Sequence, residues 1–298
     1  MGEENSPLLA SKSAGKNEPV QLQSLLITGC STGFGRVTAL HFARKGWRVF
    51  ATVRKESDRE SLLNEKAGDI APILCDVARE DQVRELGRAV AAQTPALDAL
   101  VNNAGSAFAS PMELIPPDVL REQFELNVIA QVAVAQAVMP LLKAARGTII
   151  NVSSISGRVT SPLLGPYSAS KFALEAISDA MRVELAPLGV KVVIVEPGSS
   201  PTAIWQTSMT RALSMLKARG LDIGPYAPLV KVMVAGAEER SKAGFPPQLF
   251  ADTAEKILRS PKPAARYPIP GRVAWVIRAR RFMPDGLWDW MVRRAMGW

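Results

Sequence analysis

Cysteine and histidine are scarce in this chain of 298 residues, which has two of the first and one of the second. Cys30 and Cys75 lie in different predicted elements at no disulfide-like spacing, so we expect free thiols in a reducing compartment. The single histidine, His41, falls within a helical pattern, where a structural role is more common than a catalytic one. We therefore expect no metal site, and no Ser-His-Asp hydrolase unless His41 is its base.

Long apolar runs are also missing, since no stretch is long enough to be interpreted as a signal peptide or a membrane span. Residues 1–20 are polar, and Ser, Lys, Asn, Glu, Gly and Pro dominate them. We expect this segment to be a disordered leader. These features favour a cytoplasmic protein, and the tail described next leaves membrane association open.

Positive charge is concentrated near the end of the chain, which has a formal net charge of +8. The stretch from Arg259 to Trp298 holds nine Lys or Arg and two Asp, and four of the six Trp. Within the basic, Trp-rich tail, residues 271–298, an apolar stripe at helical spacing consists of Leu287, Trp288, Met291, Val292 and Ala295. This amphipathic helix could lie on an anionic membrane, or it could dock on the core or on a second subunit. We expect no nucleic-acid partner.

Strand-like apolar runs alternate with helical patterns from Leu22 onward. The predicted strands cover residues 25–28, 47–53, 70–75, 97–101, 148–152 and 191–195. The predicted helices cover residues 37–45, 57–66, 81–92, 117–124 and 126–144, and a segment that starts near Tyr167. This alternation predicts an α/β protein, in which a Rossmann-like doubly wound parallel sheet is covered by helices on both faces. We expect one domain over residues 21–270, with a C-terminal helical extension.

A glycine-rich loop, Thr28 to Gly35, joins the first predicted strand to the first predicted helix. Glycines allow positive φ and a close approach of the backbone to a pyrophosphate, and the start of a helix favours its negative charge. We interpret the loop as a nucleotide site, with a ligand-free turn as the alternative. The residues expected to contact the cofactor here are Gly29, Ser31, Thr32, Gly33, Phe34 and Gly35.

The second predicted strand ends without an acidic residue, because Arg54 and Lys55 precede the first carboxylate, Glu56. A carboxylate at that end would bond the ribose 2′-hydroxyl of NAD, whereas Arg suits the 2′-phosphate of NADP. We therefore predict NADP(H) as the cofactor and assign Arg54 to its phosphate. Ordinary surface charge is the alternative.

Polar residues and glycines follow the later strands at the edge where a parallel sheet binds its ligands. Asp76 could accept a hydrogen bond from the adenine amino group, and Asn127 lies among apolar neighbours between two helical runs. Each position alone is a weak signal, but together they predict an active site. They are Asp76, Val77, Asn103, Ala104, Gly105, Asn127, Ser153, Ser154, Pro197 and Gly198.

Tyr167 and Lys171 lie four residues apart, which places both side chains on one face of a helix. A phenol is normally a poor acid near neutral pH. A neighbouring ammonium favours the phenolate, so we expect Lys171 to lower the pKa of Tyr167 toward the working range. The pair is a candidate proton-transfer device, and a surface Tyr and Lys on an amphipathic helix is the alternative.

In this order, the motifs resemble those of the short-chain dehydrogenase/reductase family in its single-domain form. The resemblance covers about Leu22 to Ile269. The family's serine precedes its tyrosine by thirteen residues, which selects Ser154 rather than Ser153. The residues that match are the loop at 28–35, Asp76, Asn102 to Gly105, Asn127, Ser154, Tyr167, Lys171, Pro197, Gly198 and Thr202.

The resemblance implies interconversion of a ketone or aldehyde and an alcohol, with hydride exchanged with the nicotinamide. Tyr167 would act as general acid or base, and Ser154 would hydrogen-bond the substrate oxygen. Lys171 would hold the nicotinamide ribose, Asn127 would anchor a relay water, and Thr202 would bond the carboxamide. The family also implies a homodimer or homotetramer. Pro201 departs from the usual pattern before Thr202.

Residues 200–245 are expected to contain a lid over the substrate, chiefly 203–225. This segment is rich in apolar side chains, which favours a hydrophobic substrate, although ordinary helix packing explains them too. An alternative function is a catalytically silent nucleotide-binding scaffold or sensor. A third is a peripheral membrane protein that acts through its tail. The apolar lid residues are Trp205, Met209, Leu213, Met215 and Leu216.

Overall fold

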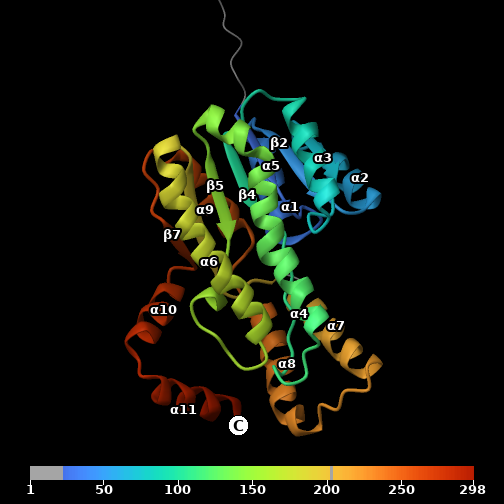
Figure 1. Ribbon diagram of the computed structural model, residues 1–298, viewed down its shortest axis with the longest axis vertical. Helices are drawn as coiled ribbons and strands as arrows, with labels where there is room; N and C mark the ends of the chain where they lie inside the picture. The colour runs from blue at the N-terminus through green and yellow to red at the C-terminus, as the bar shows by residue number, and fades with distance from the viewer. Residues whose placement is uncertain (1–22, 202–203) are drawn as a thin grey trace, which may run out of the picture.

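The computed structural model describes residues 23–201 and 204–298, apart from some side chains within 204–243, so the expected leader lies outside it. In that part of the chain seven parallel strands form one sheet, in the order β3-β2-β1-β4-β5-β6-β7 (Figure 1). The α/β, Rossmann-like fold predicted from the alternating pattern is confirmed. The strands are β1 (Ser24–Ile27), β2 (Arg48–Val53), β3 (Ile70–Leu74), β4 (Ala99–Asn102), β5 (Thr148–Val152), β6 (Lys191–Pro197) and β7 (Arg266–Ile269).

Helices cover both faces of the sheet, so successive residues of a strand are buried on opposite faces. Leu25 and Ile27 of β1 join the core beneath α1 and α9, whereas Leu26 joins the core beneath α3 and α5. Because both faces are buried, the strands lack the polar alternation of a half-exposed sheet. The helices over the sheet and at its edge are α1 (Gly33–Arg44), α2 (Glu56–Asn64), α3 (Glu80–Ala91), α5 (Ala130–Ala145), α6 (Gly165–Leu185) and α9 (Gln248–Arg259).

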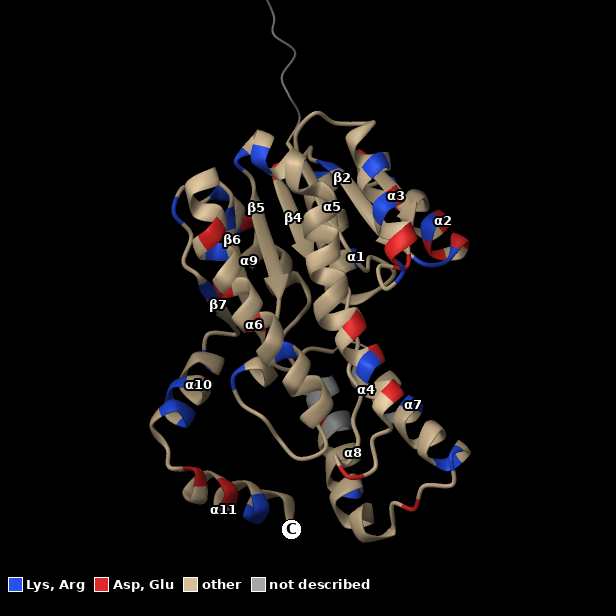
Figure 2. Cartoon of the chain, in the orientation of Figure 1, with Lys and Arg blue, Asp and Glu red and all other residues tan. Residues whose placement is uncertain are grey.

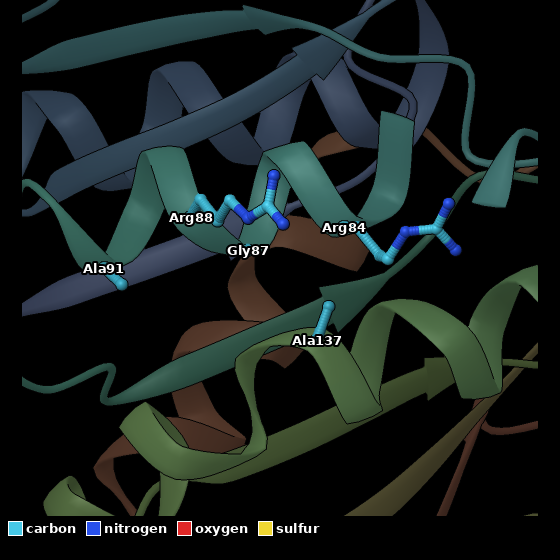
Figure 3. Close-up of a pocket in the computed structure, with 5 residues that line it drawn as sticks. All are labelled: Arg84, Gly87, Arg88, Ala91 and Ala137. Carbon is cyan, nitrogen blue, oxygen red and sulfur yellow. The ribbon is translucent and has the colours of Figure 1, made fainter. Parts of the chain in front are cut away.

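The α3–α5 contact is close because a glycine faces an alanine there. A Cβ at Gly87 would lie 2.8 Å from the carbonyl oxygen of Ala137. Figure 3 shows the shallow pocket beside this contact, where Arg84 and Arg88 extend from α3. Both Arg side chains form ion pairs within α3, so we assign this pocket to helix packing.

The seventh strand, β7, was not predicted, and it lies at one edge of the sheet. It contains Arg266 and Pro268 and is only partly buried, so it lacks the apolar signal of the inner strands. A proline cannot donate to the strand ladder and is tolerated at an edge. The opposite edge strand, β3, likewise contains a proline, Pro72.

The two helical runs predicted at 117–124 and 126–144 form one continuous helical segment. It consists of α4 (Pro117–Phe124), a π-helical stretch η1 (Glu125–Ile129) and α5. Contrary to our expectation, this segment is long and apolar enough to cross a membrane, and it is the one such helix among the described residues. Packing offers a sufficient reason for its composition, since Val134, Val138 and Leu142 of α5 lie in the core.

The remaining helices lie beyond the carboxyl ends of the strands (Figure 1). α7 (Ile204–Ala218), the short η4 (Gly224–Tyr226) and α8 (Ala227–Ala243) occupy the segment predicted as the lid. Arg219 and Arg211 of this segment form ion pairs with Asp118 and Glu122 of α4. The C-terminal extension is present as α10 (Val273–Phe282) and α11 (Asp285–Met296).

Candidate active site

The glycine-rich loop follows β1 and turns into α1, which begins at Gly33, four residues earlier than predicted. Gly29 and Gly33 have φ of 73° and 60°, in the left-handed region that favours glycine. Thr32 precedes the helix without a side-chain capping bond, and the first turn contains no acidic residue. The N–H groups at the start of α1 can therefore receive an anion such as a pyrophosphate.

Hydrogen bonds join this loop to the segment that follows β4. The hydroxyl of Thr28 accepts from the backbone N–H groups of Asn103 and Ala104, at 3.0 and 2.9 Å. The Asn103 side-chain amide donates to the carbonyl oxygen of Thr28 at 2.8 Å. A Cβ at Gly29 would lie 2.9 Å from the Cα of Ala104, so the backbones are in close contact. From β1 the chain continues to β2 on one side, and from β4 it continues to β5 on the other side. Doubly wound sheets bind dinucleotides at this point, where the strand order reverses.

The Phe34 side chain packs among other aromatic rings. Its ring stacks on those of Phe245 and Phe250, with centroids 5.6 and 4.8 Å apart. The predicted contact of Phe34 with the cofactor stays a prediction. Ser31 and Thr32 are at least partly exposed beside it, as a cofactor contact requires.

At the end of β2, Arg54 is exposed. Its side chain makes no hydrogen bond or ion pair with any described residue. The nearest carboxylate in sequence, Glu56, forms an ion pair with Arg59 at 2.8 Å. Arg54 can therefore receive an anionic group.

The turn after β3 positions Asp76. Its carboxylate accepts from the N–H of Ala78 at 3.1 Å, and its own N–H donates to the side chain of Gln82 at 2.7 Å. Val77 is buried. Asp76 thus lies at the same sheet edge as the glycine loop, as predicted.

Asn127 is completely buried in the π-helical stretch between α4 and α5. Its side-chain oxygen accepts from the N–H of Ser106 at 3.0 Å, and its NH₂ group donates to the Ser106 carbonyl at 2.9 Å and the Ser170 hydroxyl at 3.0 Å. A Cβ built at Gly105 would lie 3.1 Å from the Asn127 oxygen and 3.7 Å from Lys171 Nζ. Asn127, Gly105 and Lys171 therefore lie close together.

Ser154, Tyr167 and Lys171 are all buried at the carboxyl end of β5. The Ser154 hydroxyl accepts from the N–H of Ser156 at 3.1 Å and lies 3.5 Å from the carbonyl oxygen of Pro197. The Lys171 ammonium donates to the carbonyl oxygen of Val152 at 2.8 Å, and it lies 5.9 Å from the centroid of the Tyr167 ring. The fold thus gathers the predicted catalytic side chains in one place.

Burial controls the ionisation of the Tyr167 hydroxyl and the Lys171 ammonium. It raises the pKa of the Tyr167 hydroxyl, and a hydrogen bond with Ser154 opposes the rise. Burial also lowers the pKa of Lys171 to about 8, opposed by the negative charge of Glu175. The expected lowering of the Tyr167 pKa is therefore wrong for the protein alone. The Lys171 ammonium bonds a backbone carbonyl, and burial of the phenol dominates.

The other predicted cofactor residues follow β6. Pro197 ends this strand, and Gly198 donates its N–H to the carbonyl oxygen of Ile269 at 2.7 Å. Thr202 lies outside the described residues. Within the described parts of the chain, no cluster of His, Cys, Asp or Glu could hold a metal ion.

A buried ion network beside Lys171 was not predicted. Glu175, one turn after Lys171 on α6, bonds Arg266 of β7 at 3.0 Å. Glu196 of β6 bonds Arg158 at 3.2 Å and lies 3.6 Å from Arg266. The i,i+4 spacing from Lys171 could have indicated Glu175, but no local pattern indicates that Arg158, Glu196 and Arg266 meet.

Comparisons with known proteins agree with this arrangement. The family model described as short chain dehydrogenase matches residues 23–212. The NADPH-dependent 3-dehydrocapnine reductase of Ornithobacterium rhinotracheale is 34% identical, covering 89% of this chain and 94% of the relative. The 3-ketodihydrosphingosine reductase of Bacteroides thetaiotaomicron is 31% identical, covering 92% and 98%. A crystal structure of a short-chain dehydrogenase from Streptomyces avermitilis aligns with a TM-score of 0.75 at 25% identity, covering 89% of this chain and 94% of that one.

The matched model spans the glycine loop, the residues after β4, Asn127 and the Ser154, Tyr167 and Lys171 group. It covers more than half of the chain, and both relatives are covered almost completely. The roles of the individual side chains remain predictions. The chain belongs to the short-chain dehydrogenase/reductase family and is an oxidoreductase that uses a nicotinamide dinucleotide to interconvert carbonyl and alcohol groups.

Proposed function

We propose that this protein is an NADP(H)-dependent reductase of a hydrophobic ketone or aldehyde, or in the reverse direction an alcohol dehydrogenase. The observation that carries the proposal is the burial of Ser154, Tyr167 and Lys171 together at the carboxyl end of β5. In a water-poor site, hydrogen bonds to a developing oxyanion are stronger than in bulk water. A nucleotide-binding scaffold would have no chemical need for this trio.

In the proposed reaction, the Tyr167 hydroxyl donates its proton to the substrate oxygen as that oxygen gains negative charge. The Ser154 hydroxyl hydrogen-bonds the same oxygen and stabilises that charge. Lys171 keeps an ammonium near the phenol and restores its proton. When bound, NADPH supplies the hydride to the carbonyl carbon. Asn127 holds the segment around Ser106 beside Lys171. It also anchors a water that relays protons between solvent and the Lys171 ammonium.

NADP(H) is favoured over NAD(H) by the end of β2. Arg54 is exposed there without a side-chain partner among the described residues, whereas Glu56 is neutralised by Arg59. A ribose 2′-phosphate would receive a charge-assisted hydrogen bond from Arg54, and no free carboxylate would repel it. The NADPH dependence named for the 3-dehydrocapnine reductase supports this assignment.

A hydrophobic substrate is supported by how the lid packs. Leu229 and Met233 of α8 form a cluster with Leu163 and Leu164, which directly precede the helix of Tyr167. In a second cluster, Ala212 of α7 packs with Phe108 and Val119. The segments around the catalytic side chains are therefore lined with apolar contacts, as sites for apolar ligands usually are. The names of two relatives specify 3-dehydro and 3-keto substrates, which supports a ketone.

The assembly and location are part of this proposal. We propose a homodimer or homotetramer that pairs through α6, because Phe172 and Val183 are exposed on that helix. We also propose a cytoplasmic protein, since Cys30 and Cys75 are buried free thiols.

The test is an NADPH-oxidation screen over aliphatic, aromatic, steroid and retinoid carbonyls and 3-ketodihydrosphingosine, repeated with NADH. We expect consumption of NADPH with an apolar carbonyl, and a loss of about 10²- to 10⁴-fold in the Tyr167→Phe variant, which removes the proton donor. NADPH binding, followed by fluorescence, should persist in that variant. Tyr267→Phe is the matched control, because the hydroxyl of Tyr267 only accepts a hydrogen bond from the backbone of Ala264. Turnover by Tyr167→Phe at the parent rate would contradict the role of Tyr167, and no turnover by the parent would favour a nucleotide-binding sensor.

A further inference from the structure

The C-terminal helices α10 and α11 expose large apolar side chains, and none of the three largest joins a hydrophobic cluster of the described structure. Trp275 and Phe282 of α10 are 70% and 82% exposed, and Trp290 of α11 is 54% exposed. Soluble proteins expose single apolar residues routinely, but contiguous exposed patches usually mark an interaction site.

The exposed side chains follow the same helical spacing in both helices. In α10 the positions i, i+3, i+4 and i+7 are Trp275, Arg278, Ala279 and Phe282. In α11 the same positions are Leu287, Trp290, Met291 and Arg294, of which Leu287 and Met291 are 48% and 41% exposed. Each helix therefore presents an apolar face that also contains an arginine. Leu287 and Met291 belong to the stripe predicted at 287–295, whereas Trp290 and Arg294 on the exposed face do not.

The helices are fixed at both ends, so this face has a defined position. Val273 is buried at the start of α10, where a Cβ on Gly198 would lie 2.8 Å from its Cγ2. Met296 packs on the cluster of Leu163, Leu164, Leu229 and Met233, and the Trp298 ring stacks on that of Tyr226 with centroids 5.9 Å apart. Between these anchors no residue of α11 is buried.

The rings of Trp275, Phe282 and Trp290 each have a guanidinium over them. Arg278 lies 5.7 Å from the Trp275 centroid, and Arg281 lies 6.0 Å from that of Phe282. Residues 271–298 hold six Arg and two Asp, and Figure 2 shows blue residues on α10 and both red and blue residues on α11. Aromatic and apolar groups set among cations are the composition of helices that lie in the interface of an anionic bilayer.

We propose that α10 and α11 form a membrane-binding face that docks on an anionic lipid surface. A symmetric contact with a second copy would place the Arg-rich face against itself, and this like-charge contact is unfavourable. Lipid phosphates and serine carboxylates supply the missing negative charge. The helices α10 and α11 lie beyond the carboxyl ends of the strands, on the same side as α7 and α8 (Figure 1). The inference does not depend on the reaction proposed above.

The experiment is flotation of the full-length protein with two kinds of vesicle, phosphatidylcholine alone and phosphatidylcholine mixed with phosphatidylserine. We expect the protein to float with the second kind and not with the first, and added NaCl should weaken binding by screening. The double variant Trp275→Ser with Phe282→Ser should bind about tenfold more weakly or worse, because two buried aromatic groups are lost. Its control replaces two exposed leucines elsewhere, Leu63→Ser with Leu188→Ser, and should bind like the parent.

The charge contribution is tested separately. Arg278→Gln with Arg281→Gln should lower vesicle affinity by about fivefold for each Arg removed. Its control removes the same charge from α3, as Arg84→Gln with Arg88→Gln, and should have a much smaller effect. Circular dichroism establishes that each variant is folded. The proposal is overturned if the parent does not bind anionic vesicles, or if the α10 variants bind as well as their controls. A Ser variant that becomes monomeric with unchanged vesicle binding would also overturn it and assign the face to a subunit contact.

Discussion

Lys171 keeps an ammonium group in a buried position, and this makes its ionisation depend on the protein around it. Burial lowers its pKa to about 8, while Glu175 partly restores the charged form. Because the unfolded chain binds this proton up to about pH 10.5, the folded state is destabilised below pH 8 and regains stability between pH 8 and about 10.5. Carbonyl reduction should fall above about pH 8, as the ammonium that supports Tyr167 is lost.

The Lys171→Met variant tests both consequences. We expect a loss of reduction of about 100-fold or more, and loss of the stability gain between pH 8 and about 10.5, measured by chemical unfolding. The control is Lys143→Met, which removes an exposed lysine of α5 and should change neither result. If Lys171→Met retained the parent's pH–rate profile, Lys171 would not be the group that titrates.

Arg54 allows cofactor choice to be tested at a single side chain. Arg54→Ala should raise the KM for NADPH by about 10-fold to 100-fold, because a charge-assisted hydrogen bond to the 2′-phosphate contributes about 1.5–3 kcal/mol. The KM for NADH should stay nearly unchanged, since NADH has no phosphate at that position. Arg44→Ala, an exposed position at the far end of α1, serves as the control. Equal changes for both cofactors would refute the assignment.

Most of the candidate site could be predicted from the sequence because its residues follow strand ends. The glycine loop, Asp76 and Ser154 each come directly after an apolar run, and parallel strands bring such positions to one edge. Spacing does not reveal burial or hydrogen-bond partners. The one-turn separation of Tyr167 and Lys171 was correct, but the bond from Lys171 to the Val152 carbonyl and the burial of the phenol depend on the packed fold.

At the scale of elements, a buried ion network ties α6 to β6 and β7. Burial, together with the charge of Glu175, raises the pKa of Glu196 to about 7, while Arg158 and Arg266 oppose the rise. The folded state then binds a proton that the unfolded chain has released by about pH 4.5, so this group lowers stability as the pH rises from about 4.5 to about 7. We expect Glu196→Gln to have the parent's stability near pH 4 and to exceed it by a few kcal/mol near pH 8.

Urea unfolding between about pH 4 and pH 8 measures this effect of Glu196 on stability. A variant on the other face of the sheet, Glu255→Gln, should change stability in the opposite direction. Burial alone would raise the pKa of Glu255, but hydrogen bonds from Lys45 and His41 lower it below its usual range. Glu255→Gln should therefore destabilise the protein near pH 7, and the loss should vanish at acidic pH. If Glu196→Gln retained the parent's pH dependence, another group would control it.

Elements with a strong periodic signal were predicted, and those without one were missed. The inner strands and most helices have continuous or periodic apolar residues, because both faces of the sheet are buried. β7 was missed because Arg266 and Pro268 interrupt its pattern at an edge. The π-helical stretch was missed because it requires one extra residue per turn around Asn127, and Asn127 is held there by Ser106 and Ser170, which are distant in sequence.

At the scale of the whole molecule, the segment predicted as the lid and the tail both lie beyond the carboxyl ends of the strands (Figure 1). Composition indicated both segments, but their positions depend on contacts between residues far apart in sequence. Arg219 fixes α7 to α4 through Asp118, and Met296 fixes α11 to α8. The surface of α6 that we propose for assembly belongs to a different element from the face formed by α10 and α11.

Phe172 and Val183 lie eleven residues apart on α6, close to three helical turns, so both project from one face. They are 44% and 66% exposed, and pairing of this helix with its copy would bury them in a symmetric contact. The double variant Phe172→Asp with Val183→Asp would place four carboxylates in that contact, and we expect it to shift the protein from oligomer to monomer in sedimentation velocity. Leu63→Asp with Leu188→Asp adds the same charge at exposed positions outside the helix and should leave the assembly intact. An unchanged sedimentation coefficient in the α6 variant would refute pairing through this helix, because buried like charges cannot be accommodated without separation of the subunits.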